Sequence, residues 1–215
     1  MNISAQMVKE LRNKTSAGIM DCKEALGASE GNIEKAIEYL RKKGIKAASL
    51  KFNRPALSGK IESYIHLYGK IGVLVEINCE TDFVANTEEF KEFVKDIAMQ
   101  IAASDPKYIS REEIPKSIIK KEREIFYAQG EKTNKPAVVI EKIVEGKLEK
   151  YFQENCLLEQ LFIKDTSKSI NELLLETIAK LGENILIKRF ARFKLGEEIW
   201  KSKHKNTIFL DVSYY

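Results

Sequence analysis

Residues that build metal and disulfide sites are scarce in this 215-residue sequence, which has three cysteines and two histidines. Cys22, Cys79 and Cys156 are odd in number and far apart, unlike the paired framework of a disulfide-stabilised secreted protein. We interpret them as small buried hydrophobic side chains. No Cys-x-x-Cys pair accompanies His66 or His204, which argues against a structural zinc site. We therefore expect a reducing, cytoplasmic environment, with no metal and no cofactor.

Helix-breaking residues and long apolar runs are also scarce. Only four prolines and 11 glycines occur, which favours long helices with few irregular loops. No stretch approaches the roughly 20 apolar residues of a membrane span, and the first residues lack the charged and then apolar pattern of a signal peptide. The P-loop, Gly-x-Ser-x-Gly and His-Glu-x-x-His motifs are missing as well. We therefore expect neither a membrane protein nor an enzyme.

Charge is abundant but nearly balanced, with 36 lysines and arginines against 32 aspartates and glutamates. The net charge of +4 is too small to indicate a dedicated nucleic-acid-binding protein, whose basic residues usually gather on one face. Mixed signs on solvated helix faces are the simpler interpretation. RNA binding remains an alternative that predicts a steep loss of affinity with salt. The basic residues that would carry it are Lys42, Lys43, Lys46, Lys51 and Arg54.

The pattern of apolar residues and helix breakers predicts four parts. In chain order these are a three-helix domain, a linker, a second domain and a loosely ordered tail, over residues 1–44, 45–58, 59–196 and 197–215. In the first part the apolar residues recur at helical spacing, and Met20, Ala25 and Leu26 are assigned to the apolar stripe of the second helix. Gly44 is placed to act as the C-cap of the third helix.

The second domain is predicted to be α+β, with a small antiparallel sheet covered by helices. Residues 61–68 alternate apolar and polar side chains, which is typical of a strand. The dipeptide Gly69-Lys70 fits a two-residue turn, and residues 71–79 would return as the second strand. Residues 185–195 are predicted to form a last strand.

Helix ends within this domain are predicted from capping patterns. Asn86 and Glu89 resemble a capping box that starts one helix. Ser169 and Glu172 resemble a second capping box, whose helix ends before Gly182. Other boundaries are predicted at three positions: a helix start at Ser110, a helix start at Pro136 and a break at Gly146.

Between the second predicted strand and the next helix lies a short segment that we call the Asp-Phe turn (residues 81–86). It places a carboxylate, Asp82, beside a large aromatic side chain, Phe83. Loops that are held by rigid elements often carry binding groups. A phenylalanine at such a turn either packs into the protein's own core or is offered to a partner, and the sequence pattern leaves both possibilities open.

Two sequence blocks resemble one known family. The first is VKELRNKTSAGIMDCKEAL at residues 8–26, and the second is EINCETDFVAN at residues 76–86. Both are similar to signatures of bacterial elongation factor Ts, and they occur in the order found in that family. The resemblance covers nearly all of residues 1–196. It implies a guanine-nucleotide exchange factor that acts on elongation factor Tu during translation elongation.

The resemblance also implies roles for individual residues. The first three helices look like the ubiquitin-associated-type domain of the family, which contacts the nucleotide-binding domain of elongation factor Tu. By matching positions, the candidate contacts there are Arg12, Met20 and Lys23. In the family the second block intrudes beside the nucleotide site and dislodges magnesium, and this role would fall here to Thr81, Asp82, Phe83 and Val84.

The length of the second domain leaves room for one core subdomain, as in the short class of the family. A second copy of the chain could supply the other half of the core, so a homodimer is expected. The partners expected from the resemblance are thus elongation factor Tu and a second copy, with no membrane and no direct nucleic acid. The alternative from another class is a binding module or holdase for elongation factor Tu that lacks exchange activity.

Overall fold

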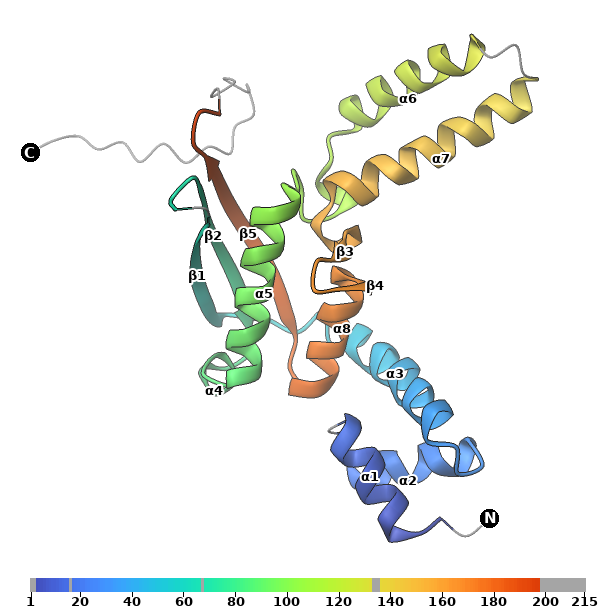
Figure 1. Cartoon of the computed structure of the whole chain (residues 1–215), viewed down its shortest axis with the longest axis vertical. Coiled ribbons are helices and arrows are strands. Elements are labelled where there is room, and N and C mark those ends of the chain that lie inside the picture. Colours follow the sequence, from blue (N-terminus) through green and yellow to red (C-terminus); the bar gives the residue numbers. More distant parts are fainter. Residues whose placement is uncertain (1–2, 16, 67, 133–135, 198–215) are drawn as a thin grey trace, which may run out of the picture.

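The structure is a computed structural model that describes residues 3–15, 17–66, 68–132 and 136–197 (Figure 1). It combines three N-terminal helices with a small antiparallel sheet packed against helices, which confirms the predicted α+β class. The predicted tail lies outside the described residues from residue 198 onward. No helix in the described ranges is both long enough and apolar enough to cross a membrane.

The N-terminal helices are α1 (Ala5–Thr15), α2 (Ile19–Ala28) and α3 (Ile33–Ser49). Their small core consists of Leu11, Cys22, Ala25, Leu26 and Ala36, with Met7, Val8 and Ile37 packed around it. Met20 does not join this core, because 74% of its surface is exposed. The assignment of Met20 to the buried stripe of the second helix is therefore wrong.

Helix α3 continues through Gly44, so the prediction of a C-cap at this glycine is also wrong. A Cβ atom at Gly44 would lie 3.1 Å from the Cβ of Ala179 on helix α8 (Ile170–Leu181). The glycine thus permits close packing of two helices, and this contact supports the helix beyond the point where its sequence pattern fades. The helix takes up the first five residues of the predicted linker, to Ser49.

The sheet has the strand order β1-β2-β5, and both neighbouring pairs are antiparallel. Strand β1 spans Ser58–His66, β2 spans Ile71–Cys79 and β5 spans Ile185–Lys194. The two strands of the predicted hairpin and the last strand are confirmed. The two-residue turn predicted at Gly69-Lys70 is wrong, since β1 ends at His66, which pairs with Ile71, and the connection is longer than two residues. Alternate residues of β2, from Val73 to Cys79, are buried on one face of the sheet. None of the described helices covers the other face (Figure 1).

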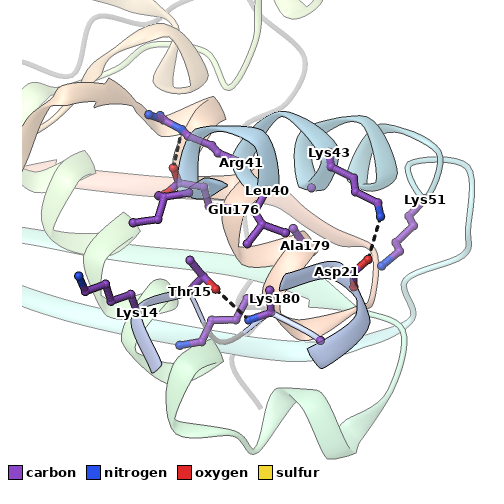
Figure 2. Close-up of a pocket in the computed structure, with 14 residues that line it drawn as sticks. Lys14, Thr15, Asp21, Leu40, Arg41, Lys43, Lys51, Glu176, Ala179 and Lys180 are labelled. Carbon is purple, nitrogen blue, oxygen red and sulfur yellow. Dashed lines mark hydrogen bonds and ion pairs between the residues drawn. The ribbon is translucent and has the colours of Figure 1, made fainter. Parts of the chain in front are cut away.

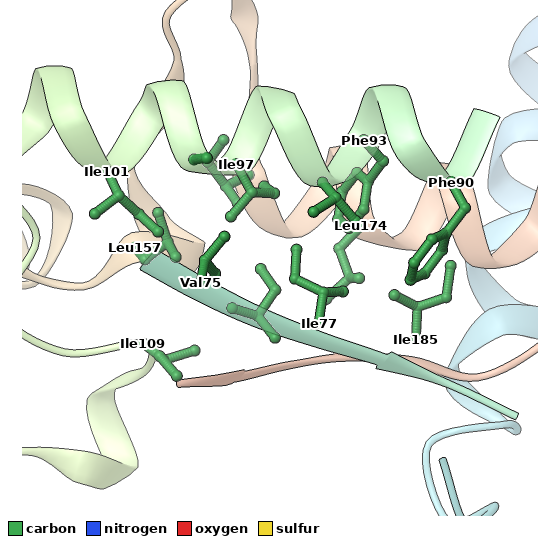
Figure 3. Packing of buried hydrophobic residues seen from close by; sticks show 14 of the residues in the cluster. Val75, Ile77, Phe90, Phe93, Ile97, Ile101, Ile109, Leu157, Leu174 and Ile185 are labelled. Atoms are coloured by element: carbon green, nitrogen blue, oxygen red, sulfur yellow. The ribbon is translucent and has the colours of Figure 1, made fainter. Parts of the chain in front are cut away.

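Two long helices cover the inner face of the sheet, α5 (Glu88–Ser104) and α8. Figure 3 shows the side chains of α5, among them Phe90, Ile97 and Ile101, directed toward β2. All three are fully buried, and removal of such a side chain from water stabilises the fold by roughly 1.5–3 kcal/mol. This core holds the Asp-Phe turn between β2 and α5.

Capping explains where these helices begin and end. The Ser169–Glu172 capping box and the left-handed Gly182 at the end of α8 are confirmed. The predicted capping box at Asn86 is wrong, since the N-cap of α5 is Thr87, whose Oγ1 accepts a hydrogen bond from the Phe90 N–H at 3.2 Å. Asn86 instead ends the one-turn helix α4 (Asp82–Ala85).

A helical hairpin of α6 (Lys116–Glu131) and α7 (Ala137–Asn155) projects from the body (Figure 1). It has its own small core of Ile140, Val144 and Leu148. Helix α7 begins after Pro136, as predicted, but continues through Gly146, where a break was predicted. One glycine inside a helix costs only about 1 kcal/mol, which packing in the hairpin can offset.

Short elements connect the hairpin to the rest of the chain. Ser110 precedes a single 3-10 turn, Arg111–Glu113, and not the long helix predicted to start there. After α7 the chain forms a second 3-10 turn, Leu157–Glu159, and a two-stranded ribbon of β3 (Leu161–Phe162) and β4 (Asp165–Ser169). These elements lead directly into α8.

Candidate functional site

The Asp-Phe turn presents its aromatic side chain to solvent. Phe83 lies on helix α4 and is 82% exposed, whereas Ala85 on the same helix is buried. The side chain of Thr81 caps α4 by accepting a hydrogen bond from the Val84 N–H at 3.4 Å. The Asn86 amide donates to the Asp82 carbonyl at 2.9 Å. Local hydrogen bonds therefore form the turn, and Phe83 does not pack into the core of the chain.

The carboxylate of Asp82 is exposed beside Phe83 at the first turn of α4. Within the described part of the chain it has no hydrogen bond or ion pair. A carboxylate of this kind is free to accept strong hydrogen bonds from donors on another molecule. The turn thus offers an apolar ring and an anionic acceptor side by side.

Behind the turn lies the buried thiol of Cys79, which donates a hydrogen bond to the Thr81 carbonyl at 3.1 Å. Burial, reinforced by the negative charge of Glu183, raises the pKa of Cys79 to about 11. At neutral pH only about one thiol in ten thousand would be ionised at such a pKa. Because the thiolate is the reactive form of cysteine, Cys79 acts here as a packing residue and not as a nucleophile.

The turn is also fastened by the segment that joins α8 to β5. Glu183 accepts hydrogen bonds from the Thr81 N–H at 3.0 Å and from the Thr81 hydroxyl at 2.6 Å. A second link has its glutamate on the other segment: Glu80, next to the turn, accepts a hydrogen bond from the Asn184 N–H at 2.6 Å. No local sequence pattern signals this link, because its partners are more than 100 residues apart.

The three N-terminal candidates are all exposed. Arg12 lies on α1, while Met20 and Lys23 lie three residues apart on α2 and so share one helix face. Ile19, which the sequence reasoning missed, is exposed beside Met20. These residues are exposed on the N-terminal helices and are separate in the chain from the Asp-Phe turn on the sheet domain.

A cavity of about 540 Å³ lies where the three N-terminal helices meet α8 (Figure 2). Leu40 and Ala179 contribute apolar surface to it, and charged residues stand around them. Lys43 pairs with Asp21 at 2.9 Å, and Arg41 pairs with Glu176 at 3.0 Å. These ion pairs span between elements, so the cavity marks a junction between packed helices.

No group of three or more histidine, cysteine, aspartate or glutamate side chains among the described residues is arranged to hold a metal ion. The Asp-Phe turn offers two exposed groups, Phe83 and Asp82, on a turn held by the hydrogen bonds of Thr81 to Glu183. Such an arrangement is suited to binding another macromolecule, since large exposed apolar side chains beside polar groups are typical of interaction sites.

Comparison with known proteins gives one consistent result. The family model described as elongation factor TS matches residues 1–197. A relative named elongation factor Ts from Caldanaerobacter subterraneus subsp. tengcongensis is 62% identical over 199 residues, which cover 93% of this chain and 100% of the relative. A second, from Carboxydothermus hydrogenoformans, is 60% identical over 94% of this chain and 93% of its own length.

A third relative of the same name, from Syntrophus aciditrophicus, is 55% identical over 94% of this chain and the whole of its own length. The matched region includes both sequence blocks and every described helix and strand. Membership of such a family makes the chain a protein of translation elongation. This chain therefore belongs to the elongation factor Ts family.

Proposed function

We propose that this chain is a guanine-nucleotide exchange factor for elongation factor Tu. It binds elongation factor Tu with GDP, dislodges magnesium and promotes GDP release so that GTP can rebind. The observation that supports this most directly is the exposed Phe83 on a turn fastened from behind by Glu183. The factor acts in the cytoplasm without catalysing a reaction and without holding metal or nucleotide itself.

The proposed mechanism acts through the metal of the partner. Magnesium bridges the phosphates of a bound nucleotide and offsets their negative charge. A conformation of the partner with a disrupted metal site holds GDP weakly. Phe83 needs only to bind this conformation better than the metal-loaded one, because a ligand shifts an equilibrium by its differential affinity. By the same linkage, GDP with magnesium must weaken binding of the factor.

We propose a division of roles between the two parts of the chain. Residues 1–44 dock on the partner through Arg12, Met20 and Lys23, and residues 59–196 carry the exchange turn at Thr81, Asp82, Phe83 and Val84. Two linked contacts reinforce each other, because the first raises the effective concentration of the second. The continuous helix α3, which crosses residue 44, supports a fixed spacing between them.

The direct test is release of a fluorescent GDP analogue from elongation factor Tu, followed with and without this protein. Exchange activity predicts a release rate that rises with the concentration of the factor and then saturates. Binding to elongation factor Tu with no change in the release rate would instead support the alternative, a binding module without exchange activity.

RNA binding is the weaker alternative, because several of the basic residues proposed for it already form ion pairs with acidic side chains. Of the basic residues proposed for it, Lys42 pairs with Glu38, Lys43 with Asp21 and Glu24, and Arg54 lies 3.6 Å from Glu80. Phosphate contacts need cations whose charge is not already offset. Measurable RNA binding that weakens steeply with salt would revive this alternative.

We further propose that the chain forms a homodimer through the outer face of its sheet. Exposed apolar residues from all three strands lie on this face, namely Ile61, Ile65, Leu74, Leu186 and Phe193. Among them, the ion pair between Glu76 and Arg189 bridges β2 and β5. Exposed apolar patches rimmed by polar groups commonly mark protein interfaces, and a second copy supplies a matching surface by symmetry.

Leu74→Lys is expected to convert the dimer to a monomer. Leu74 lies on the central strand of the face, and a two-fold axis there would place a buried charge in each copy, which is strongly unfavourable. Light scattering at micromolar concentration should give twice the chain mass of 24.6 kDa for the wild type and the chain mass for the variant. Val138→Lys on the exposed face of the hairpin is the control, and a monomeric wild type would contradict the proposal.

A further inference from the structure

The carboxylate of Glu183 is fully engaged with a single residue of the Asp-Phe turn. One oxygen accepts from the Thr81 N–H at 3.0 Å, and the other accepts from the Thr81 hydroxyl at 2.6 Å. Glu183 follows Gly182, which ends α8 in the left-handed conformation with φ of 78°. The helix end thus directs this carboxylate at the base of the turn that carries Phe83.

We propose that Glu183 is a positioning residue for nucleotide exchange, which holds the Asp-Phe turn so that Phe83 is presented in its binding conformation before the partner arrives. This inference rests on the proposed exchange function. Glu183 acts through Thr81 and α4, and it is not itself a contact with the nucleotide or the metal.

Helix α4 is weak on its own. It has four residues, and so short a helix is not stable in isolation, since helix nucleation is unfavourable. Its first N–H groups have no partner within the helix. The Thr81 hydroxyl oxygen satisfies the Val84 N–H, and this requires the hydroxyl proton to point elsewhere. Glu183 accepts that proton and so selects the hydroxyl orientation in which Thr81 can cap α4.

Phe83 cannot hold the turn itself. With 82% of its surface exposed, the ring has few contacts within the chain. Without the hydrogen bonds to Glu183, the turn would sample many conformations, and the loss of this conformational freedom on binding would weaken the complex. The charge-assisted hydrogen bonds to the Glu183 carboxylate restrict the turn before the partner binds, so that less conformational entropy is lost in the complex.

Other contacts keep the surrounding strands and helices in place when Glu183 is replaced. The Asn184 amide donates to the Arg54 carbonyl at 2.7 Å, and the Asn184 N–H donates to Glu80. Residues Ile185 and Ile187 are buried in the main core. Loss of the Glu183 carboxylate is therefore expected to loosen the turn while the sheet and α8 stay folded.

The test combines exchange kinetics with amide hydrogen exchange of the free protein. Glu183→Ala is expected to lower stimulated GDP release roughly tenfold at factor concentrations well below saturation. It should also speed deuterium uptake in peptides that contain residues 81–86, with little change in α5. Glu183→Gln keeps one oxygen that can accept from Thr81 but loses the second acceptor and the charge, so its rate should lie between those of the wild type and Glu183→Ala.

A double-mutant cycle separates positioning from general stability. If Glu183 acts through Phe83, Glu183→Ala changes the rate less than twofold in a Phe83→Ala background. The proposal would be overturned if the fold-change in release rate of the double variant equalled the product of the two single fold-changes. It would also be overturned if Glu183→Ala had the wild-type release rate or the wild-type deuterium uptake in residues 81–86. The matched control is Glu172→Ala, which removes a carboxylate that accepts from a backbone N–H at the other end of α8 and should leave the exchange rate unchanged.

Failure of the exchange function itself gives a different result. A wild-type chain that does not accelerate GDP release overturns the proposed function, and with it any role of Glu183 in exchange. A wild-type chain that accelerates release while Glu183→Ala does so equally overturns the positioning role alone.

Discussion

Phe83→Ala is expected to lower stimulated GDP release from elongation factor Tu by roughly 10- to 100-fold, the range for loss of a central aromatic contact worth about 1.4–2.8 kcal/mol. The free energy of unfolding should stay close to the wild-type value. Phe83 is mostly exposed in the free chain, so its truncation removes little buried surface and leaves no cavity. The change therefore acts on the complex and not on the fold.

This result is measured as the release rate of a fluorescent GDP analogue at several factor concentrations, with thermal melting of the same samples. Phe83→Leu is the matched variant, because it keeps an apolar side chain and should retain part of the activity. A wild-type release rate in a folded Phe83→Ala protein would show that the ring is not the exchange group. Loss of folding would show that its role is structural.

Phe90→Ala, in contrast to Phe83→Ala, is expected to act on the fold. It should lower the free energy of unfolding by about 3–5 kcal/mol, as other large aromatic truncations in protein cores do. Phe90 is fully buried at the start of α5 and faces the sheet (Figure 3). Its removal leaves a cavity between the helix and β2. Since small domains are stable by only about 5–15 kcal/mol, this loss should be plain in urea unfolding.

The control for Phe90→Ala is Phe83→Ala itself, which removes the same atoms from the neighbouring short helix. Under conditions where the Phe90→Ala protein remains folded, the rate of GDP release that it stimulates should be close to the wild-type rate. An unfolding free energy within about 1 kcal/mol of the wild type would mean that the core collapses onto the cavity. The contribution of the Phe90 side chain to the stability of the fold would then be smaller than predicted.

Much of the fold could be predicted where local chemistry and tertiary packing agree. The two strands of the hairpin, the capping box at Ser169 and the glycine end of α8 each depend on a few adjacent residues, and all are confirmed. The errors lie where a distant element decides the outcome. Gly44 looked like a helix end, but it lies within α3, where its missing side chain allows contact with Ala179.

The start of helix α5 was predicted one residue too early, at Asn86. Asn86 and Thr87 are both good N-cap residues, and their spacing alone did not decide between them. In the structure Asn86 closes α4 through the Asp82 carbonyl, so the N-cap of α5 falls to Thr87. The short helix α4, which the sequence did not predict, moved the boundary by one residue.

The family, the α+β class and the location of the Asp-Phe turn could be predicted from the sequence, because they depend on contiguous motifs and on the periodicity of apolar residues. The exposure of Phe83 and the hydrogen bonds between Glu183 and Thr81 became visible only in the folded chain. Exposure and long-range hydrogen bonds depend on how α8 and β5 pack against β2. No local pattern records that packing, since residues 81 and 183 become neighbours only when the sheet and its covering helices are assembled.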